Sequence, residues 1–179
     1  SSRILWHVVK AGFPVLVFEA RRAMIYIDKG YLLELCGQLM DGHVSYQMGG
    51  KVKLSAEPSD IKAIDCSGFT RYLINRVTDG QVTPVDGSDE QNAWCKKHKL
   101  LAQTYSHVAG LSDGCLRIAF MPRPHGHVWL VMDGMTIESH GGKGPHRRTW
   151  STPILTRSVK TCYVLAHLYS MTAGPATIT

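Results

Sequence analysis

Apolar residues recur at helical spacing in three stretches of the first part of the chain. Residues 19–40 predict one kinked helix or two shorter ones that stop at Asp41-Gly42, and residues 90–107 predict another helix. Between them, residues 67–78 are typical of a helix, because apolar side chains follow one another at i, i+4 and i+8: Phe69, Leu73 and Val77. Residues 1–18 carry two short apolar runs that are typical of a short helix or a strand.

The period changes to that of β-strands in the later part of the chain. Residues 116–121, 127–132 and 135–140 are expected to be strands, and Asp133-Gly134 is a strong signal for a two-residue hairpin turn between the last two. Residues 162–168, together with Ile154-Leu155, are expected to complete the sheet. A helical first half followed by a hairpin-rich second half predicts an α+β fold.

Composition fits a protein with one ordinary core. The chain has 179 residues and is 44% hydrophobic, and no run of 18 apolar residues indicates a membrane span. We expect no signal peptide, because no small-residue cleavage site follows the apolar start. Five cysteines without a regular framework predict reduced thiols. The net charge of +6 suits a polyanionic partner, such as nucleic acid, an anionic membrane surface or the bacterial cell wall.

Cys66 is the best candidate for a nucleophile. It stands at the start of the helix predicted from residue 67, among small polar neighbours, with Asp65 or Ser67 available as the cap. The unpaired N–H groups and the positive end of the helix dipole favour a thiolate at such a position. Of the other cysteines, three lie in apolar runs typical of packing, and the fourth precedes a basic surface run: Cys36, Cys115 and Cys162, and then Cys95.

His127 is the best candidate for the base that a thiolate requires, because it opens a strand directly after a glycine-containing loop. A strict two-residue turn would place His127 opposite His140 and would make Glu138 face Trp129. A wider turn would move Glu138 alongside His127. Either Glu138 or His140 could therefore accept the imidazole N–H and fix its tautomer, and the register decides between them.

These motifs resemble the NlpC-type cysteine peptidases, which are papain-like cell-wall hydrolases. The resemblance spans about residues 43–149 and rests on four segments: Tyr46-x-Met48-Gly49-Gly50, Ile64-Asp65-Cys66-Ser67-Gly68-Phe69, Gly126-His127-Val128 and Thr136-Ile137-Glu138-Ser139-His140-Gly141. It implies a papain-like α+β domain in which the cysteine begins a helix packed on an antiparallel sheet that carries the histidine. It also implies cleavage of peptidoglycan stem peptides, commonly between D-glutamate and a diamino acid.

Carried over residue by residue, the resemblance makes Cys66 the nucleophile, with its own N–H as an oxyanion donor, and His127 the base, with Glu138 or His140 as the orienting group. Four further residues are expected to contact substrate. Tyr46 would line the cleft near the sulfur, Asp65 and Ser67 would help bind the substrate's amino end, and a bulky residue would reshape the cleft where a small one is usual: Trp129.

The resemblance also sets expectations for organisation and setting. We expect a monomeric single domain over residues 1–179, with a helical N-terminal scaffold over 1–42, a catalytic core over 43–149 and strands over 150–179. No cofactor is implied. The expected partner is the peptidoglycan stem peptide. The expected place of action is the bacterial cell wall, in the periplasm or outside the cell. A phage-encoded lytic enzyme, or an effector that other machinery delivers, would reach this place.

Three other functions use the same residues or different ones. An amidase or acyltransferase acting on a non-wall substrate would keep the Cys66 and His127 pair. A metal site could draw on three spacings, although none matches a familiar zinc pattern: Cys95-x-x-His98, His125-x-His127 and His140-x5-His146. A basic nucleic-acid-binding module would use residues 96–99 and Arg147-Arg148, but no aromatic residues interleave with these clusters as a stacking platform requires.

Overall fold

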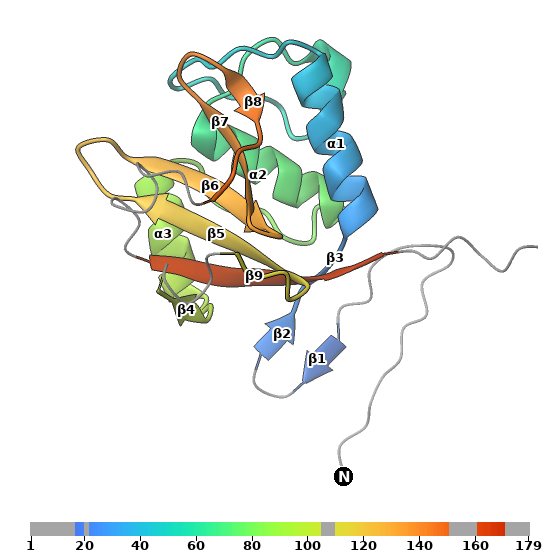
Figure 1. Cartoon of the computed structure of the whole chain (residues 1–179), viewed down its shortest axis with the longest axis vertical. Coiled ribbons are helices and arrows are strands. Elements are labelled where there is room, and N and C mark those ends of the chain that lie inside the picture. Colours follow the sequence, from blue (N-terminus) through green and yellow to red (C-terminus); the bar gives the residue numbers. More distant parts are fainter. Residues whose placement is uncertain (1–16, 20–21, 105–109, 151–160, 171–179) are drawn as a thin grey trace, which may run out of the picture.

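A computed structural model describes residues 17–19, 22–104, 110–150 and 161–170 (Figure 1). Within these residues three helices and a 3-10 turn accompany nine strands. The helical elements are α1 (Lys29–Asp41), η1 (Pro58–Asp60), α2 (Cys66–Val77) and α3 (Ser88–Lys97). None of the described helices has both the length and the apolar character that a membrane crossing requires.

One seven-stranded sheet organises the described part of the chain. Its strands lie in the order β3-β9-β5-β6-β7-β8, with β4 paired to β9. All described pairs in it are antiparallel except β3 with β9. The bounds are β3 (Tyr26–Asp28), β4 (Ala102–Gln103), β5 (Cys115–Met121), β6 (His127–Met132), β7 (Met135–His140), β8 (Gly144–His146) and β9 (Thr161–Tyr169). A separate small hairpin joins β1 (Val17–Glu19) to β2 (Arg22–Met24).

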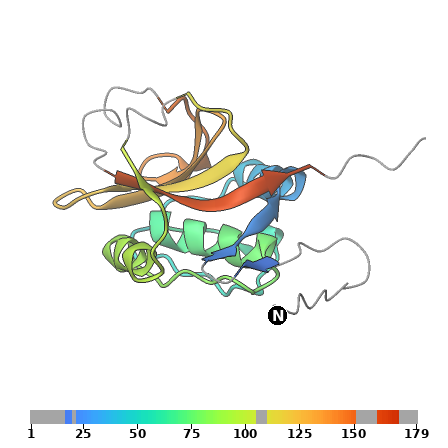
Figure 2. The ribbon, with the colours of Figure 1, turned by 90° about the horizontal axis from the view of Figure 1, so that it is seen from below.

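The helices α2 and α3 cover one face of the sheet (Figure 2). Successive residues of β6 point to opposite faces, so the strand contributes to two cores. Val128, Leu130 and Met132 join the larger core, which includes the buried side chains of α1 and α2. On the other face a smaller core forms from Ala119, Trp129, Val131, Trp150 and Cys162.

Helix α2 is buried on most of its surface, which makes it the central helix of the larger core. The predicted stripe of Phe69, Leu73 and Val77 is buried, and nine of its twelve residues are buried in all. Its polar groups have partners: the Tyr72 hydroxyl donates to the Ala56 carbonyl at 2.7 Å, and Thr70 Oγ1 donates to the Cys66 carbonyl at 3.0 Å. The helix ends at the predicted place, with Thr78 as its C-cap.

The helix predicted over residues 19–40 begins later than its spacing indicated. Residues 22–24 and 26–28 are strands, and Ile27 is paired with Leu168 of β9. Asp28 is the N-cap of α1: its carboxylate accepts from the Gly30 N–H at 2.8 Å. Pairing with β9 therefore overrides the helical period, and the N-terminal scaffold is not helical throughout.

The helix predicted over residues 90–107 was also too long. Helix α3 ends at Lys97, and Lys99 has a positive φ of 53°, which no helix continues through. The chain then forms β4, whose Gln103 pairs with Cys162 of β9. Residues 105–107 lie outside the described residues, as do residues 1–16 and the strand expected at Ile154-Leu155.

The strands predicted around the Asp133-Gly134 turn are confirmed, and so is the strict two-residue turn. Met132 pairs with Met135, and Leu130 pairs with Ile137. Both turn residues have positive φ, 53° for Asp133 and 70° for Gly134, as a type I′ turn requires. Strand β9 is confirmed as well and lies between β3 and β5 in the sheet.

Gly144, at the start of β8, provides a test of how closely this strand passes the loop before Tyr46. A Cβ there would overlap the Val44 carbonyl oxygen, and φ is +70°, whereas at Gly142 φ is +85° but the space is open. We expect Gly142→Ala to lower the free energy of unfolding by about 1 kcal/mol through backbone strain alone. Gly144→Ala should cost about 1–3 kcal/mol more, from overpacking.

Urea unfolding of the two variants beside the wild type measures this difference. Equal destabilisation by both variants would show that β8 and residue 44 are not in close contact.

Candidate active site

The start of α2 places Cys66 at the first helical position. Asp65 is the N-cap: its carboxylate accepts from the Gly68 N–H at 2.6 Å, and its carbonyl accepts from the Phe69 N–H at 2.9 Å. Cys66 is only 8% exposed and joins the larger core. The Cys66 N–H belongs to the first helical turn, where the helix itself offers no acceptor; its use as an oxyanion donor stays a prediction.

Asp65 and Ser67 are built into this turn. The second oxygen of Asp65 accepts from the Gly49 N–H at 3.1 Å, and the Ser67 hydroxyl donates to the first oxygen at 3.1 Å. Both residues are buried. Gly68 allows the close fit, because a Cβ there would lie 3.0 Å from the Gly50 carbonyl oxygen. In this structure the two polar side chains hold the helix start against the Gly49-Gly50 loop; their contact with a substrate stays a prediction.

Tyr46 lies beside the sulfur, as predicted. A parallel bridge pairs Ser45 with Ala63, and the Ile64 N–H donates to the Ser45 carbonyl at 2.9 Å, which carries the Tyr46 loop along the segment that leads into Cys66. Burial, the nearby negative charges of Cys66 and Asp65, and a hydrogen bond with Cys66 all raise the pKa of Tyr46. The phenol is therefore protonated and positioned to donate to sulfur.

His127, the first residue of β6, lies between Cys66 and Glu138. Its Nε2 is 2.8 Å from Glu138 Oε2, which leaves Nδ1 for the hydrogen bond with Cys66. Burial alone would lower the pKa of His127, but the hydrogen bonds and negative charges of Cys66 and Glu138 outweigh it and raise the pKa to about 9. The imidazole is thus held as a cation at neutral pH.

Glu138 has no exposed surface, and all its polar contacts come from the protein. Its Oε1 accepts from Thr136 Oγ1 at 2.7 Å and from Arg148 Nε at 2.6 Å, and Arg148 Nη2 donates to Oε2 at 3.2 Å. Burial would raise the pKa of this carboxyl, but the hydrogen bonds from His127, Thr136 and Arg148, with the charge of Arg148, lower it to about 2. Glu138 is therefore a carboxylate at every pH of interest.

The register explains how Glu138 meets His127. Continuing the pairing of Leu130 with Ile137 by one position puts Glu138 opposite Trp129, as expected for a two-residue turn. His127 is then its diagonal neighbour on the same face, within reach of a long side chain. The strict two-residue turn therefore already brings Glu138 to His127, because the glutamate spans the diagonal.

His140 is near His127 but makes no described hydrogen bond to it. Its Nδ1 lies 2.6 Å from the Gly141 carbonyl oxygen, and the two imidazole rings are 6.2 Å apart between centroids. It lies closer to His146, with centroids 4.5 Å apart. Burial, ahead of the charge of His146, lowers the pKa of His140. Of the two candidates for the third residue, the structure brings Glu138 and not His140 into contact with His127.

Trp129 does not line a cleft. Its side chain is fully buried, stacks on the His127 ring at 5.2 Å between centroids, and contacts Trp150 at 5.7 Å. The expected contact of Trp129 with substrate is therefore wrong. Because Trp129 points to the same face of the sheet as His127, it lies in the smaller core and packs against the imidazole ring from the buried side.

Two groups around Glu138, Thr136 and Arg148, were not recognised in the sequence. Arg147-Arg148 had been interpreted only as a possible nucleic-acid footprint. Thr136 lies two residues before Glu138 and so shares its face of the strand, a signal that alternation could have given. The approach of Arg148 to the same carboxylate depends on the turn that follows β8, which no spacing in the sequence predicts.

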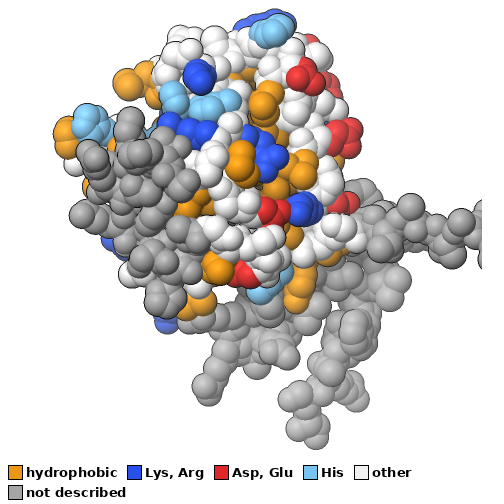
Figure 3. Space-filling model, viewed as in Figure 1, with side chains coloured by type: hydrophobic (Ala, Val, Ile, Leu, Met, Phe, Trp, Pro, Cys, Tyr) orange, Lys and Arg blue, Asp and Glu red, His pale blue; other side chains and the backbone are white. Residues whose placement is uncertain are grey.

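Figure 3 shows histidine and arginine or lysine side chains gathered on the face over β7 and β8. Among the described residues, no group of three His, Cys, Asp or Glu side chains is arranged so that it could hold a metal ion.

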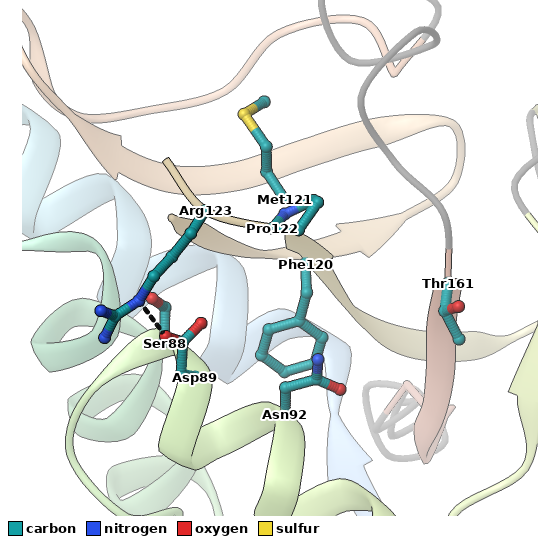
Figure 4. A pocket seen from close by; sticks show the side chains of 8 residues that line it. All are labelled: Ser88, Asp89, Asn92, Phe120, Met121, Pro122, Arg123 and Thr161. Atoms are coloured by element: carbon teal, nitrogen blue, oxygen red, sulfur yellow. Dashed lines mark hydrogen bonds and ion pairs between the residues drawn. The ribbon is translucent and has the colours of Figure 1, made fainter. Parts of the chain in front are cut away.

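A shallow pocket lies between the start of α3 and the end of β5 (Figure 4). Met121, at its edge, is paired with His127 across the two strands. An exposed ion pair between Arg123 and Asp89, 2.5 Å long, joins α3 to the loop that precedes His127. Such a pair contributes at most about 1 kcal/mol in water, so the loop is held only weakly there. The lining residues are Ser88, Asp89, Asn92, Phe120, Met121, Pro122, Arg123 and Thr161.

No family model and no curated protein sequence matches the chain. Among solved structures it is similar to a Staphylococcus aureus protein described as similar to lipoprotein, of the NLP/P60 family, with a TM-score of 0.53 and 11% identity over 84% of this chain. A Bacillus cereus NLPC/P60 family protein matches at 19% identity over 72% of this chain, with a TM-score of 0.48. The chain spans 46% and 39% of these proteins. The first similarity confirms the papain-like α+β fold.

The raised pKa of His127 gives a direct test of the site without any substrate. The imidazole should stay protonated through neutral pH and lose its proton as the pH rises through about 9, well above the ordinary value of about 6.5. NMR titration of labelled histidine follows this step. Cys66→Ala and Glu138→Gln should each bring the midpoint down, because each removes one anion from the ring. A wild-type midpoint near 6.5 would contradict the described contacts.

Proposed function

We propose that the chain is a cysteine peptidase that hydrolyses amide bonds in the stem peptides of peptidoglycan. One observation carries this proposal: Cys66, at the start of α2, shares His127 with a fully buried carboxylate, Glu138. That is the arrangement of an activated nucleophile, a base and an orienting group. The resemblance of the surrounding motifs, and the fold shared with a protein named for the NLP/P60 family, support the cell wall as the source of substrate.

The reaction follows from these contacts. The Cys66 thiolate attacks the amide carbonyl carbon, so that a C–S bond forms and the carbonyl electrons become an oxyanion that the Cys66 N–H stabilises. Protonated His127 then gives its proton to the leaving nitrogen as the C–N bond breaks. In the second half, His127 takes a proton from water, the hydroxide attacks the thioester, and the C–S bond breaks to return the thiolate. Glu138 keeps the imidazole oriented and stabilises its cationic form.

The finer proposal is cleavage between D-glutamate and a diamino acid, by a monomer acting at the cell wall. The net charge of +6 and the cationic face over β7 and β8 suit a polymer whose peptides carry free carboxylates (Figure 3). A phage lytic enzyme or a delivered effector would present the site to such a substrate. Tyr46, beside the sulfur, would then contact the peptide near the scissile bond.

Digestion of purified peptidoglycan tests the proposal. The wild type should release peptide fragments whose masses identify the bond, and Cys66→Ala should release none while keeping its fold, since it removes one sulfur atom. A folded wild type that leaves peptidoglycan intact would contradict the cell-wall assignment. Turnover of another amide or an acyl group, lost in Cys66→Ala, would instead establish an amidase or acyltransferase on the same residues.

The third residue is tested by comparing Glu138→Gln with His140→Ala. Glu138→Gln keeps the shape of the side chain but removes the negative charge that stabilises protonated His127. The value of kcat should therefore fall by about 100-fold or more. His140→Ala should change kcat severalfold at most, because His140 makes no described hydrogen bond to His127. A larger loss in His140→Ala than in Glu138→Gln would reverse the assignment.

A further inference from the structure

Arg148 is joined to Glu138 by two hydrogen bonds along one edge of its guanidinium. Nε donates to Oε1 at 2.6 Å and Nη2 to Oε2 at 3.2 Å, a two-point contact that fixes the carboxylate plane as well as its position. The backbone of Arg148 is fixed from the same strand: the Thr136 N–H donates to its carbonyl at 2.8 Å, and its own N–H donates to Thr136 Oγ1 at 3.2 Å. Thr136 and Arg148 thus form one support for Glu138.

The charges of the site explain what this support does. His127 contacts two groups that carry negative charge in the proposed mechanism, the Cys66 thiolate and the Glu138 carboxylate. One imidazolium balances only one of them, and a surplus charge is costly where Glu138 has no exposed surface and Cys66 has little. The Arg148 guanidinium, which is one-quarter exposed, supplies the second cation. Two cations and two anions then alternate along the site.

The other charged and titratable groups near these side chains do not take this place. His146 Nε2 is 3.8 Å from Glu138 Oε1, beyond hydrogen-bond distance, and His140 faces His146 and the Gly141 carbonyl. Tyr46 and Asp65 are on the Cys66 side. Arg147, the neighbour of Arg148 in the chain, makes no described contact with Glu138.

We propose that Arg148 is a positioning residue of this site: it fixes the plane of the Glu138 carboxylate and balances its charge, and thereby holds His127 in the orientation in which it activates Cys66. The inference rests on the proposed function for the role of Cys66 and His127, and it concerns the orientation of His127, not the substrate. Arg148 itself does not touch the reacting atoms.

Alkylation of Cys66 tests this without a substrate. The rate of reaction with iodoacetamide, followed at Cys66 by peptide mass mapping across pH 5 to 9, reports the thiolate. In Arg148→Met the Glu138 carboxylate loses its two-point contact and the cation that balances it, so the alkylation rate at pH 6 should fall by about tenfold. Arg148→Lys keeps the positive charge but cannot make the two-point contact. Its alkylation rate should therefore lie between the rates of the wild type and of Arg148→Met.

Two controls make the result specific. Arg147→Met removes a neighbouring arginine of the same size that lacks the contact with Glu138, and should leave the alkylation profile of the wild type unchanged. When Arg148→Met is added to Glu138→Gln, the alkylation rate should stay at that of Glu138→Gln alone, because no carboxylate is left for Arg148 to balance. Thermal unfolding checks each variant, and if Arg148→Met does not fold, Arg148→Lys carries the comparison.

An alkylation profile of Arg148→Met that matches the wild type would overturn the inference, and so would an equal fall in the Glu138→Gln background. The proposed function fails by a different result, which is intact peptidoglycan after incubation with the wild type. A chain that leaves peptidoglycan intact but shows the expected profiles would keep Arg148 in its role and require another acyl substrate.

Discussion

A carboxylate with no exposed surface must be compensated entirely by the protein, and Glu138 is in this position. Removing one partner of a buried charge pair commonly costs about 3–5 kcal/mol, because the remaining charge has lost its water as well. His127, Thr136 and Arg148 share the compensation and come from β6, from β7 itself and from the segment after β8. The requirement to satisfy one carboxylate therefore fixes three segments relative to each other, and with them the ring that faces the sulfur.

The other half of the site depends on a second carboxylate. Asp65 ends the approach to α2, caps the helix and binds the Gly49 N–H, so the loop that carries Tyr46 and the helix that begins at Cys66 meet at one side chain. Ser139 Oγ then donates to the Ile64 carbonyl at 2.9 Å, which ties β7 to this approach. Ser139 follows Glu138 directly in the chain. Two consecutive residues of β7 therefore contact the two halves of the site, Glu138 the histidine and Ser139 the segment that leads to the cysteine.

Local signals were enough for the parts of the fold that depend on neighbours in sequence. The Asp-Cys-Ser-Gly turn, the stripe of α2 and the type I′ hairpin each have a local physical cause, and the structure has all three. The segment around Ile27 was misread because its strand conformation comes from β9, about 140 residues later. The roles of Trp129 and Arg148 were predicted wrongly for a related reason. Only the assembled sheet determines which of its faces is buried and which residues lie opposite a given side chain.

The position of β9 has a consequence for how the chain acquires its site. This strand lies between β3 and β5, which come from residues near 27 and near 118, so the strand that joins these two is supplied by residues 161–169. Such long-range pairing makes folding slow relative to local elements. During synthesis, α2 can form with Cys66 at its start long before β5 gains β9 as its neighbour. The nucleophile is therefore assembled early, and the sheet that carries its base is completed late, after residue 169 has left the ribosome.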